Sequence, residues 1–314
     1  MHKLFLLSFI FLASASLRAQ TVTVKDTSWK KGGFFSASLS QTQYNNWAGG
    51  GENSLAINGL LNVFENYKIG KTSWENSLDL GYGLVKLSDN PMRKSDDKIE
   101  LNSKYGRQAK GKFFYSGLLN FKSQFAPGYN YPDDTNAISK FLAPAYLTVA
   151  IGMDYKPTDY FSVFLSPATG KFTFVNDQDI ADKGLYGNEA AHFDSATNTL
   201  VHGEKSRAEF GASLNSKFQK DIFKNVNLLA KLNLFDNYTI EDASKRWNID
   251  VNFEGLLTLK VNKFLSASIS VNVVYDDDVL IPLYADVSGI KTQTGTGKRT
   301  QVKDIIGVGL AYKF

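Results

Sequence analysis

The stretch with the weakest strand pattern carries the residues best suited to metal chemistry. Between residues 176 and 204 the chain holds four aspartates, two glutamates and two histidines: Asp177, Asp179, Asp182, Glu189, His192, Asp194, His202 and Glu204. The first three aspartates lack the glycine at the sixth position of a calcium loop, and the histidines lie ten residues apart without a third matched ligand. A solvated surface loop is the favoured interpretation, and weak divalent binding stays open.

Catalytic chemistry has little support elsewhere in the chain. There is no cysteine, which excludes disulfides, thiolate metal sites and thiol nucleophiles. A Gly-x-Ser-x-Gly elbow is also absent. The sequence has three histidines, and apart from His192 and His202 the third is His2. An outer-membrane phospholipase would need a serine, a histidine and a polar partner together, so this enzyme class is a remote alternative. We therefore expect no catalytic residue, no metal site and no cofactor.

Two short runs suggest ion binding but have simpler explanations. Three consecutive aspartates, Asp276 to Asp278, follow a strand-like segment and are expected to face solvent. Gly49, Gly50 and Gly51 precede no helix that could present its N-terminus to a phosphate. Conformational freedom in a tight loop is the better explanation for these glycines.

The elements that must position any site are predicted by an alternation of apolar and polar residues. From Trp247 to Val261 the odd positions are mainly apolar and the even positions mainly polar. A period of two held for this long predicts a β-strand. Applied to the whole chain, the same test gives twelve segments, at 32–43, 52–67, 72–87, 97–108, 112–125, 141–155, 159–175, 204–221, 225–238, 244–262, 263–278 and 301–314.

The lengths of these segments and of their connections favour one fold class, an all-β transmembrane antiparallel barrel. Most segments are well above the roughly 5 to 6 residues of an ordinary strand and long enough to cross a bilayer when tilted. Tight turns alternate with longer loops along the chain, as in a barrel whose two ends face different sides of a membrane. A secreted β-sandwich or β-helix shares the strand pattern but has no reason for this alternation of loops.

In this register, charges of both signs face the lumen. The inward positions predicted to line it are Glu75, Asp79, Lys98, Glu100, Lys104, Lys122, Lys217, Lys231, Asp250, Glu254, Lys260 and Lys303. Bulky residues such as Phe34, Phe114 and Phe164 also point inward. A paired, largely occluded interior is favoured over a conducting pore, because twelve strands lie between filled small barrels and open large ones. Charged rings that select small solutes remain the alternative.

The N-terminus has the three regions of a secretory signal peptide. A basic start is followed by the apolar run from Leu4 to Ala13 and by small residues ending at Ala19. The apolar run is too short for a spanning helix. We expect residues 1–19 to be a cleaved signal peptide, residues 20–31 a short periplasmic lead and residues 32–314 a single barrel domain in the outer membrane.

Three stretches carry a resemblance to a known family. They are the N-terminal segment, the sequence Trp29-Lys30-Lys31-Gly32-Gly33, and the sequence Asn46-Trp47-Ala48-Gly49-Gly50-Gly51-Glu52-Asn53-Ser54. Together they are similar to a Bacteroidota outer-membrane β-barrel family known only as domain of unknown function 3078. The resemblance implies an outer-membrane barrel and supplies no established activity.

The aromatic C-terminus suggests how the chain is inserted. The terminal Tyr312 and Phe314 are similar to the aromatic-ended last strand by which barrel-assembly machinery recognises its clients. We expect the protein to be a non-catalytic outer-membrane barrel, an accessory or structural component of an outer-membrane assembly, or alternatively a narrow channel for small solutes. Its partners are then lipids, the assembly machinery and other outer-membrane proteins. The net charge of +4 is too small for nucleic-acid binding.

Overall fold

The fold was described from a computed structural model of the chain. The structure describes residues 28–44, 52–131, 133–240, 248–262, 264–279, 281–287 and 290–314. The predicted signal peptide and the glycine run Gly49–Gly51 lie outside the described residues and stay predictions.

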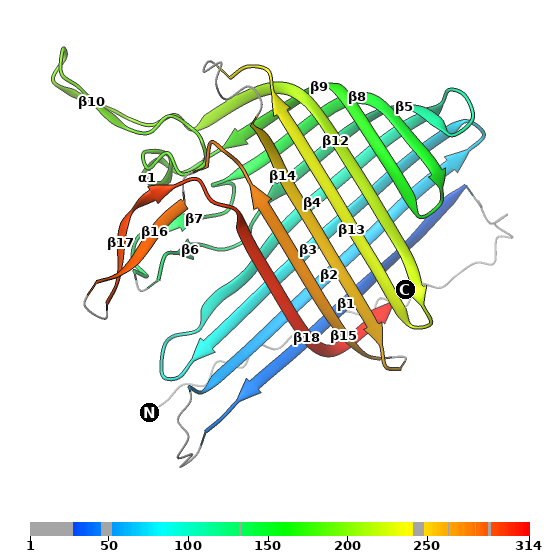
Figure 1. Cartoon of the computed structure of the whole chain (residues 1–314), viewed down its shortest axis with the longest axis horizontal. Coiled ribbons are helices and arrows are strands. Elements are labelled where there is room, and N and C mark those ends of the chain that lie inside the picture. Colours follow the sequence, from blue (N-terminus) through cyan, green and yellow to red (C-terminus); the bar gives the residue numbers. More distant parts are fainter. Residues whose placement is uncertain are drawn as a thin grey trace, which may run out of the picture.

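Twelve antiparallel strands form a closed barrel in the order β1-β18-β15-β14-β13-β12-β9-β8-β5-β4-β3-β2 (Figure 1). The predicted transmembrane-type barrel of twelve strands is therefore confirmed. Its strands are β1 (Trp29–Thr42), β2 (Ser54–Ile69), β3 (Thr72–Leu87), β4 (Arg93–Gln108), β5 (Phe113–Ser123), β8 (Ala145–Thr158), β9 (Phe161–Phe174), β12 (Ser206–Phe223), β13 (Val226–Asn237), β14 (Ile249–Lys260), β15 (Leu265–Tyr275) and β18 (Gln301–Lys313).

Each of these strands corresponds to one of the predicted segments, with ends that differ by up to a few residues. The first strand, for example, begins at Trp29 and not at residue 32. The turns at one end of the barrel are tight because residues with positive φ reverse the chain there: Gly70 (φ 53°), Gly111 (φ 58°) and Asn225 (φ 67°). We refer to this end as the short-turn end and to the other as the long-loop end.

The long loops contain short elements that the alternation test did not predict. Three hairpins form here, from β6 (Gly128–Tyr129) with β7 (Ala137–Ser139), β10 (His192–Asp194) with β11 (Thr199–Val201), and β16 (Ile281–Val287) with β17 (Ile290–Gly297). A single helical turn, α1 (Gln178–Ala181), follows β9. Ile180 and Ala181 of α1 pack with Ala143 and Val175 in a small apolar core beside Tyr186. The loops thus fold together at the long-loop end (Figure 1).

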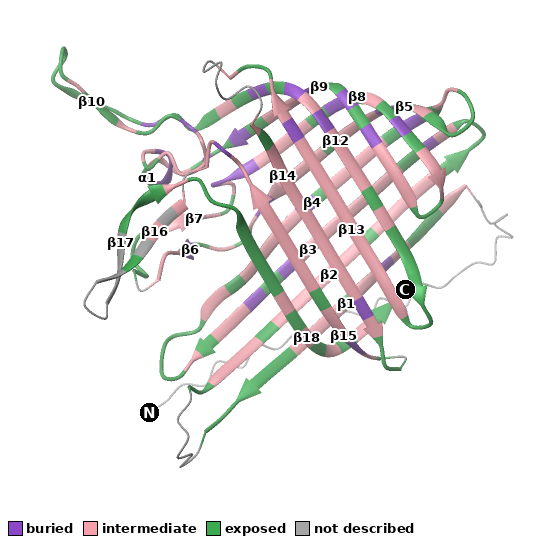
Figure 2. Ribbon diagram, in the orientation of Figure 1, coloured by how far each residue is buried: buried purple, intermediate pink, exposed green. Residues whose placement is uncertain are grey.

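Apolar side chains are exposed on the outer surface of the barrel wall. Ile151, in the middle of β8, is 71% exposed. Most of the remaining wall is half-buried (Figure 2). Aromatic rings gather at the short-turn end, where Trp29 lies 4.9 Å from Tyr67 and Phe113 lies 4.7 Å from Tyr155 between ring centroids. In the described part of the chain no helix is long and apolar enough to cross a membrane.

The barrel closes through a short ladder between its first and last strands. β1 and β18 pair over five residues, from Phe34 opposite Lys313 to Ser38 opposite Gly309. Reciprocal backbone hydrogen bonds between Gly33 and Phe314, of 2.9 and 3.1 Å, extend the ladder at the short-turn end. By contrast, β2 and β3 pair from Ser54 to Ile69. In the part of the chain that the structure describes, the β1–β18 seam is thus paired only in its short-turn half.

Replacing Gly309 by alanine is expected to weaken this closure. A Cβ atom at Gly309 would overlap the carbonyl oxygen of Ala37 on β1. Overpacking of this kind costs roughly 1–3 kcal/mol, so the free energy of unfolding should fall by about that amount. At Gly59 the added Cβ would lie 3.9 Å from the nearest atom, the Tyr82 carbonyl oxygen, so Gly59→Ala is the matched control. Refolding titrations in lipid vesicles measure both variants, and equal stabilities would contradict the prediction.

Candidate functional site in the barrel lumen

Six charged side chains meet across the middle of the barrel. Lys98 on β4 places its Nζ 2.7 Å from Glu100 Oε2 and 3.0 Å from Glu254 Oε2 on β14. Lys122 on β5 also reaches both carboxylates, at 3.4 and 3.5 Å. Lys231 on β13 contacts both Glu254, at 3.9 Å, and Asp79 on β3. We call these residues the central ion network: Asp79, Lys98, Glu100, Lys122, Lys231 and Glu254.

The central ion network joins opposite walls of the barrel. β4 and β14 stand six places apart in the closed order of twelve strands, and so do β3 and β13. The bond between Lys98 and Glu254 therefore spans the lumen. A second bridge runs from Lys231 Nζ to Asp79 Oδ2, at 3.6 Å. Direct ion pairs between opposite strands mean that side chains fill the lumen at this level.

Opposite charges are balanced within the central ion network, which holds three lysines and three carboxylates. Amides satisfy further carboxylate oxygens: Asn120 Nδ2 donates to Glu100 Oε1 at 3.0 Å, and Asn62 Nδ2 donates to Asp79 Oδ1 at 2.6 Å. Glu100 is buried, with 3% of its surface exposed. A carboxylate this far from solvent depends on its partners for its charged state.

The bridges divide the lumen into a bulky side and a small-residue side. On the side of β5, β8, β9 and β12, Phe114 and Phe164 pair in register with the buried Asp154 and share its inward face. On the side of β1, β15 and β18, most inward positions hold serine or glycine, and the bulky apolar exceptions are Phe34 toward the short-turn end and Ile305 toward the long-loop end. We call this the small-residue side, formed by Ser36, Ser38, Ser40, Ser266, Ser268, Ser270, Gly307 and Gly309.

A second cluster lies nearer the short-turn end. Lys104 Nζ is 2.7 Å from Asp154 Oδ2, and Lys156 Nζ lies 2.5 Å from Glu75 Oε1 and 3.3 Å from Asp154 Oδ2. Lys217 shares the inward face of β12 with Asn215 and, in the described part of the chain, forms no ion pair. The cluster joins β3, β4 and β8 below the central ion network.

A third cluster spans the long-loop end of the lumen. Lys171 Nζ on β9 lies 2.7 Å from Asp250 Oδ2, 3.3 Å from Asp276 Oδ2 and 3.5 Å from Glu209 Oε2. Arg207 bonds Glu209 at 3.0 Å and makes a short contact with Asp278. The third member of the aspartate run, Asp277, pairs with Lys298. All three consecutive aspartates, expected to face solvent only, therefore pair with cationic side chains.

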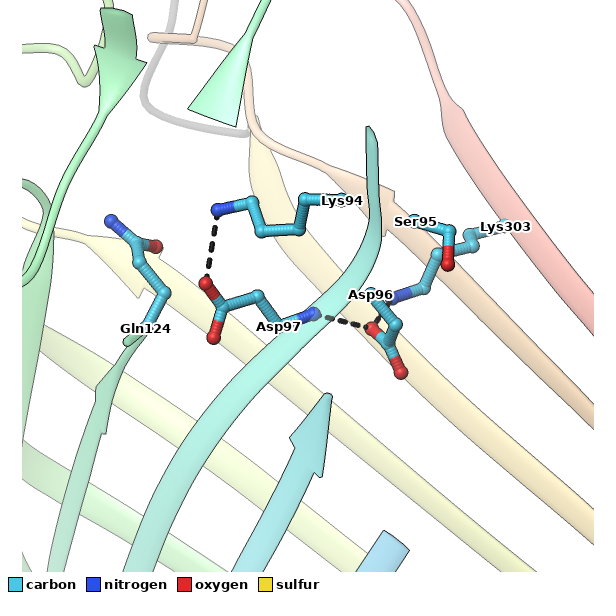
Figure 3. Close-up of a pocket in the computed structure, with 6 residues that line it drawn as sticks. All are labelled: Lys94, Ser95, Asp96, Asp97, Gln124 and Lys303. Atoms are coloured by element: carbon cyan, nitrogen blue, oxygen red, sulfur yellow. Dashed lines mark hydrogen bonds and ion pairs between the residues drawn. The ribbon is translucent and has the colours of Figure 1, made fainter. Parts of the chain in front are cut away.

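Lys303 lies apart from these clusters, close to the open half of the seam. Its Nζ is 2.6 Å from Asp96 Oδ1 on β4. These two residues and Lys94, Ser95, Asp97 and Gln124 line a polar pocket of about 170 Å³ (Figure 3). Lys260, at the end of β14, is exposed and makes no ion pair with any other described residue.

Carboxylates of the acidic loop between residues 176 and 204 bind groups of this loop and of the neighbouring loop that holds Lys140. Asp177 accepts from the backbone of α1 and pairs with Lys140 at 2.5 Å. Asp182 accepts from Gln178, His202 and the Gly203 amide, and these hydrogen bonds lower its pKa from 3.8 to about 2. Among the described residues no group of three or more potential ligands could hold a metal ion.

Several charged residues of the lumen were not among the predicted ones: Asp96, Lys156, Lys171, Arg207, Asp276 and Asp278. Strict alternation from Phe164 would place Lys171 on the outer face. The register shifts between Ser166 and Thr169, where two residues oppose the single Ala212 of β12. This one extra residue changes the inward positions from even to odd numbers. The sequence signal for this bulge is Pro167, because a proline has no backbone N–H to donate to the ladder.

Comparison with known families gives one match. Residues 39–129 match the family described as protein of unknown function (DUF3078). The matched stretch runs from the end of β1 to β6. It includes Asp79, Lys98, Glu100 and Lys122, which are four of the six members of the central ion network. No curated protein matches the chain.

Solved membrane barrels are similar at low identity. The NanC porin is 8% identical, with coverage of 89% of this chain and 98% of that chain and a TM-score of 0.37. The COG4313 outer membrane channel from Pseudomonas putida F1 is 10% identical, with coverage of 90% of this chain and 94% of that chain and a TM-score of 0.37. The translocator domain of the autotransporter NalP from Neisseria meningitidis is 11% identical, with coverage of 91% of this chain and 87% of that chain and a TM-score of 0.33. The fold assignment rests on the strand pairing described above.

Proposed function

We propose that the protein is an integral barrel of the outer membrane, exported by a cleaved signal peptide. Three features support this. A closed antiparallel barrel satisfies its own backbone and suits a lipid environment. Its outer surface exposes apolar side chains such as Ile151, and aromatic rings gather at one end, as expected at a membrane interface. The rings of Tyr312 and Phe314 are exposed on the closing strand, where assembly machinery could recognise them.

Within that membrane, the protein acts as a non-catalytic accessory or structural component of a larger assembly. The observation that carries this proposal is the central ion network, which ties β3 and β4 to the opposite strands β13 and β14. Bridges of this kind brace the wall and obstruct the lumen. The hairpins of the long loops extend beyond the wall and offer surface to other proteins (Figure 1).

Affinity isolation from native membranes tests the accessory role. A tag on the full-length chain, followed by gentle detergent extraction, should recover at least one other outer-membrane protein in fixed stoichiometry. The control is an abundant unrelated barrel tagged and extracted in the same way. The same isolation is repeated after the membranes are chemically crosslinked. Recovery of the tagged barrel alone in both cases would contradict the proposal.

A narrow channel is the second candidate, and the small-residue side of the lumen favours it. Its serines and glycines occupy less of the space beside the bridges than the phenylalanines of the bulky side do. Purified protein in planar bilayers is expected to show no steady current or only small events, because the central ion network crosses the lumen. A large, stable and weakly selective conductance would overturn the closed-lumen proposal and make solute diffusion the leading function.

A further inference from the structure

Among the described residues, the long-loop half of the β1–β18 seam has no ladder across it. Beyond Ser38 and Gly309, residues 39–42 of β1 pair with β2 and residues 301–308 of β18 pair with β15, and the described parts of the two strands do not pair with each other there. Figure 1 shows the two ribbons meeting near the C-terminus and separating toward the long-loop end. The last residues of β1, from Leu39 to Thr42, and the first of β18, from Gln301 to Asp304, are exposed on both faces. In a fully paired wall the inward side chains would be covered.

Such an opening is costly in a membrane unless something occupies it. Backbone groups without partners in hydrocarbon cost several kcal/mol each. A closed barrel normally avoids this cost by pairing every strand edge. Two unpaired strand edges that face each other in one wall therefore indicate a functional opening. The side chains that line it show what it can bind.

The two faces of the opening differ in chemistry. Outward, Leu39, Ile306 and Val308 are apolar and more than half exposed, which suits contact with acyl chains. Inward, the small residues Ser38, Ser40 and Gly307 line the opening, and Ile305 and Lys303 follow further along β18. Ser38 Oγ lies 3.1 Å from where a Gly307 Cβ would lie. The polar pocket at Lys303 and Asp96 opens inside the same end of the barrel.

We propose that this half of the seam is a lateral portal through which an acyl-chain amphiphile passes between the surrounding lipid and the small-residue side of the lumen. The polar head of the amphiphile would lie toward the serines and the pocket at Lys303, and its chain would extend through the wall. This inference does not depend on the accessory role. It concerns access to the lumen, whether or not the barrel has protein partners.

An amphiphile fits the opening better than an added β-strand does. The free edge of β1 spans residues 39–42, whereas that of β18 spans residues 301–308, so an inserted strand could pair along its length with only one of them. The axial route into the lumen is crossed by the central ion network and by the cluster around Lys171. An apolar chain therefore reaches the small-residue side most directly through the wall.

Photocrosslinking in lipid vesicles tests the portal. The full-length protein, carrying p-benzoylphenylalanine in place of Ser40, is folded into phosphatidylcholine vesicles and irradiated, and lipid attached to the residue is measured by mass spectrometry. Thr148→p-benzoylphenylalanine is the matched control, because Thr148 faces inward in the long-loop half of a fully paired part of the wall. Leu39→p-benzoylphenylalanine, at an outward position, gives the amount of lipid captured by a side chain in full contact with the bilayer. Heat-dependent gel migration confirms that each variant is folded.

Capture of lipid at Ser40 should be severalfold above that at Thr148 and comparable to that at Leu39. Capture no higher than at Thr148, including the case in which a strand fills the seam, overturns the proposal.

A disulfide staple then identifies the route. Gln41→Cys with Ile306→Cys continues the register of Ser38 and Gly309 to the third pair beyond them, so oxidation closes the seam on the far side of Ser40. Oxidation should reduce capture at Ser40 to the Thr148 level, and reduction of the disulfide should restore it. If capture at Ser40 is unchanged by the formed staple, lipid enters by another route and the portal is refuted.

Discussion

Replacing Glu254 by glutamine is expected to lower the free energy of unfolding by about 3 kcal/mol. Glu254 lies within 4 Å of Lys98, Lys122 and Lys231, and it is the carboxylate through which β14 joins the central ion network. Glutamine keeps the size of the side chain but leaves three lysines with two carboxylates. Removing one partner of a buried ion pair costs roughly 3–5 kcal/mol, and the slight exposure of Glu254 places it at the lower end.

The matched control for this variant is Glu65→Gln. Glu65 pairs with Lys31 at 2.5 Å, but both side chains are largely exposed, so its loss should cost less than about 1 kcal/mol. Urea titrations of refolding in phospholipid vesicles measure both variants on one scale. Equal stability of E254Q and the unmodified protein would show that the lysines of the lumen are solvated and that the bridges contribute no bracing.

Replacing Ile151 by arginine is expected to cost roughly 2–4 kcal/mol, because it would put a charge near the middle of the hydrocarbon. Ile151 lies halfway along β8, between Gly117 of β5 and Ala168 of β9, and its side chain is 71% exposed on the outer surface. The substitution removes no ion pair and fills no part of the lumen. The loss therefore reports on lipid contact alone.

Ile222→Arg is the control with the same pair of residue types. Ile222 lies beside the tight turn after β12, where the wall ends, so the cost there should be between about 0 and 1 kcal/mol. The same refolding titrations apply. Equal losses from I151R and I222R would contradict the placement of β8 across a bilayer.

The sequence by itself determined the class of fold and the face on which most charges lie. Alternation is a local property of each strand, so residues such as Asp250, Asn252 and Glu254 can be assigned to one face without knowing their neighbours. The regular change between tight turns and long loops then distinguished a membrane barrel from a soluble sandwich. These features needed no information on which strands are opposite.

Only the tertiary structure decided which charges meet and where the wall is open. The bond from Lys98 to Glu254 joins residues far apart in sequence, and it depends on the order and stagger of all twelve strands. The bulge after Ser166 turned Lys171 inward, because one extra residue reverses every later position of a strand. The partial seam between β1 and β18 likewise arises from where their registers meet on closure, and no pattern within either strand specifies it.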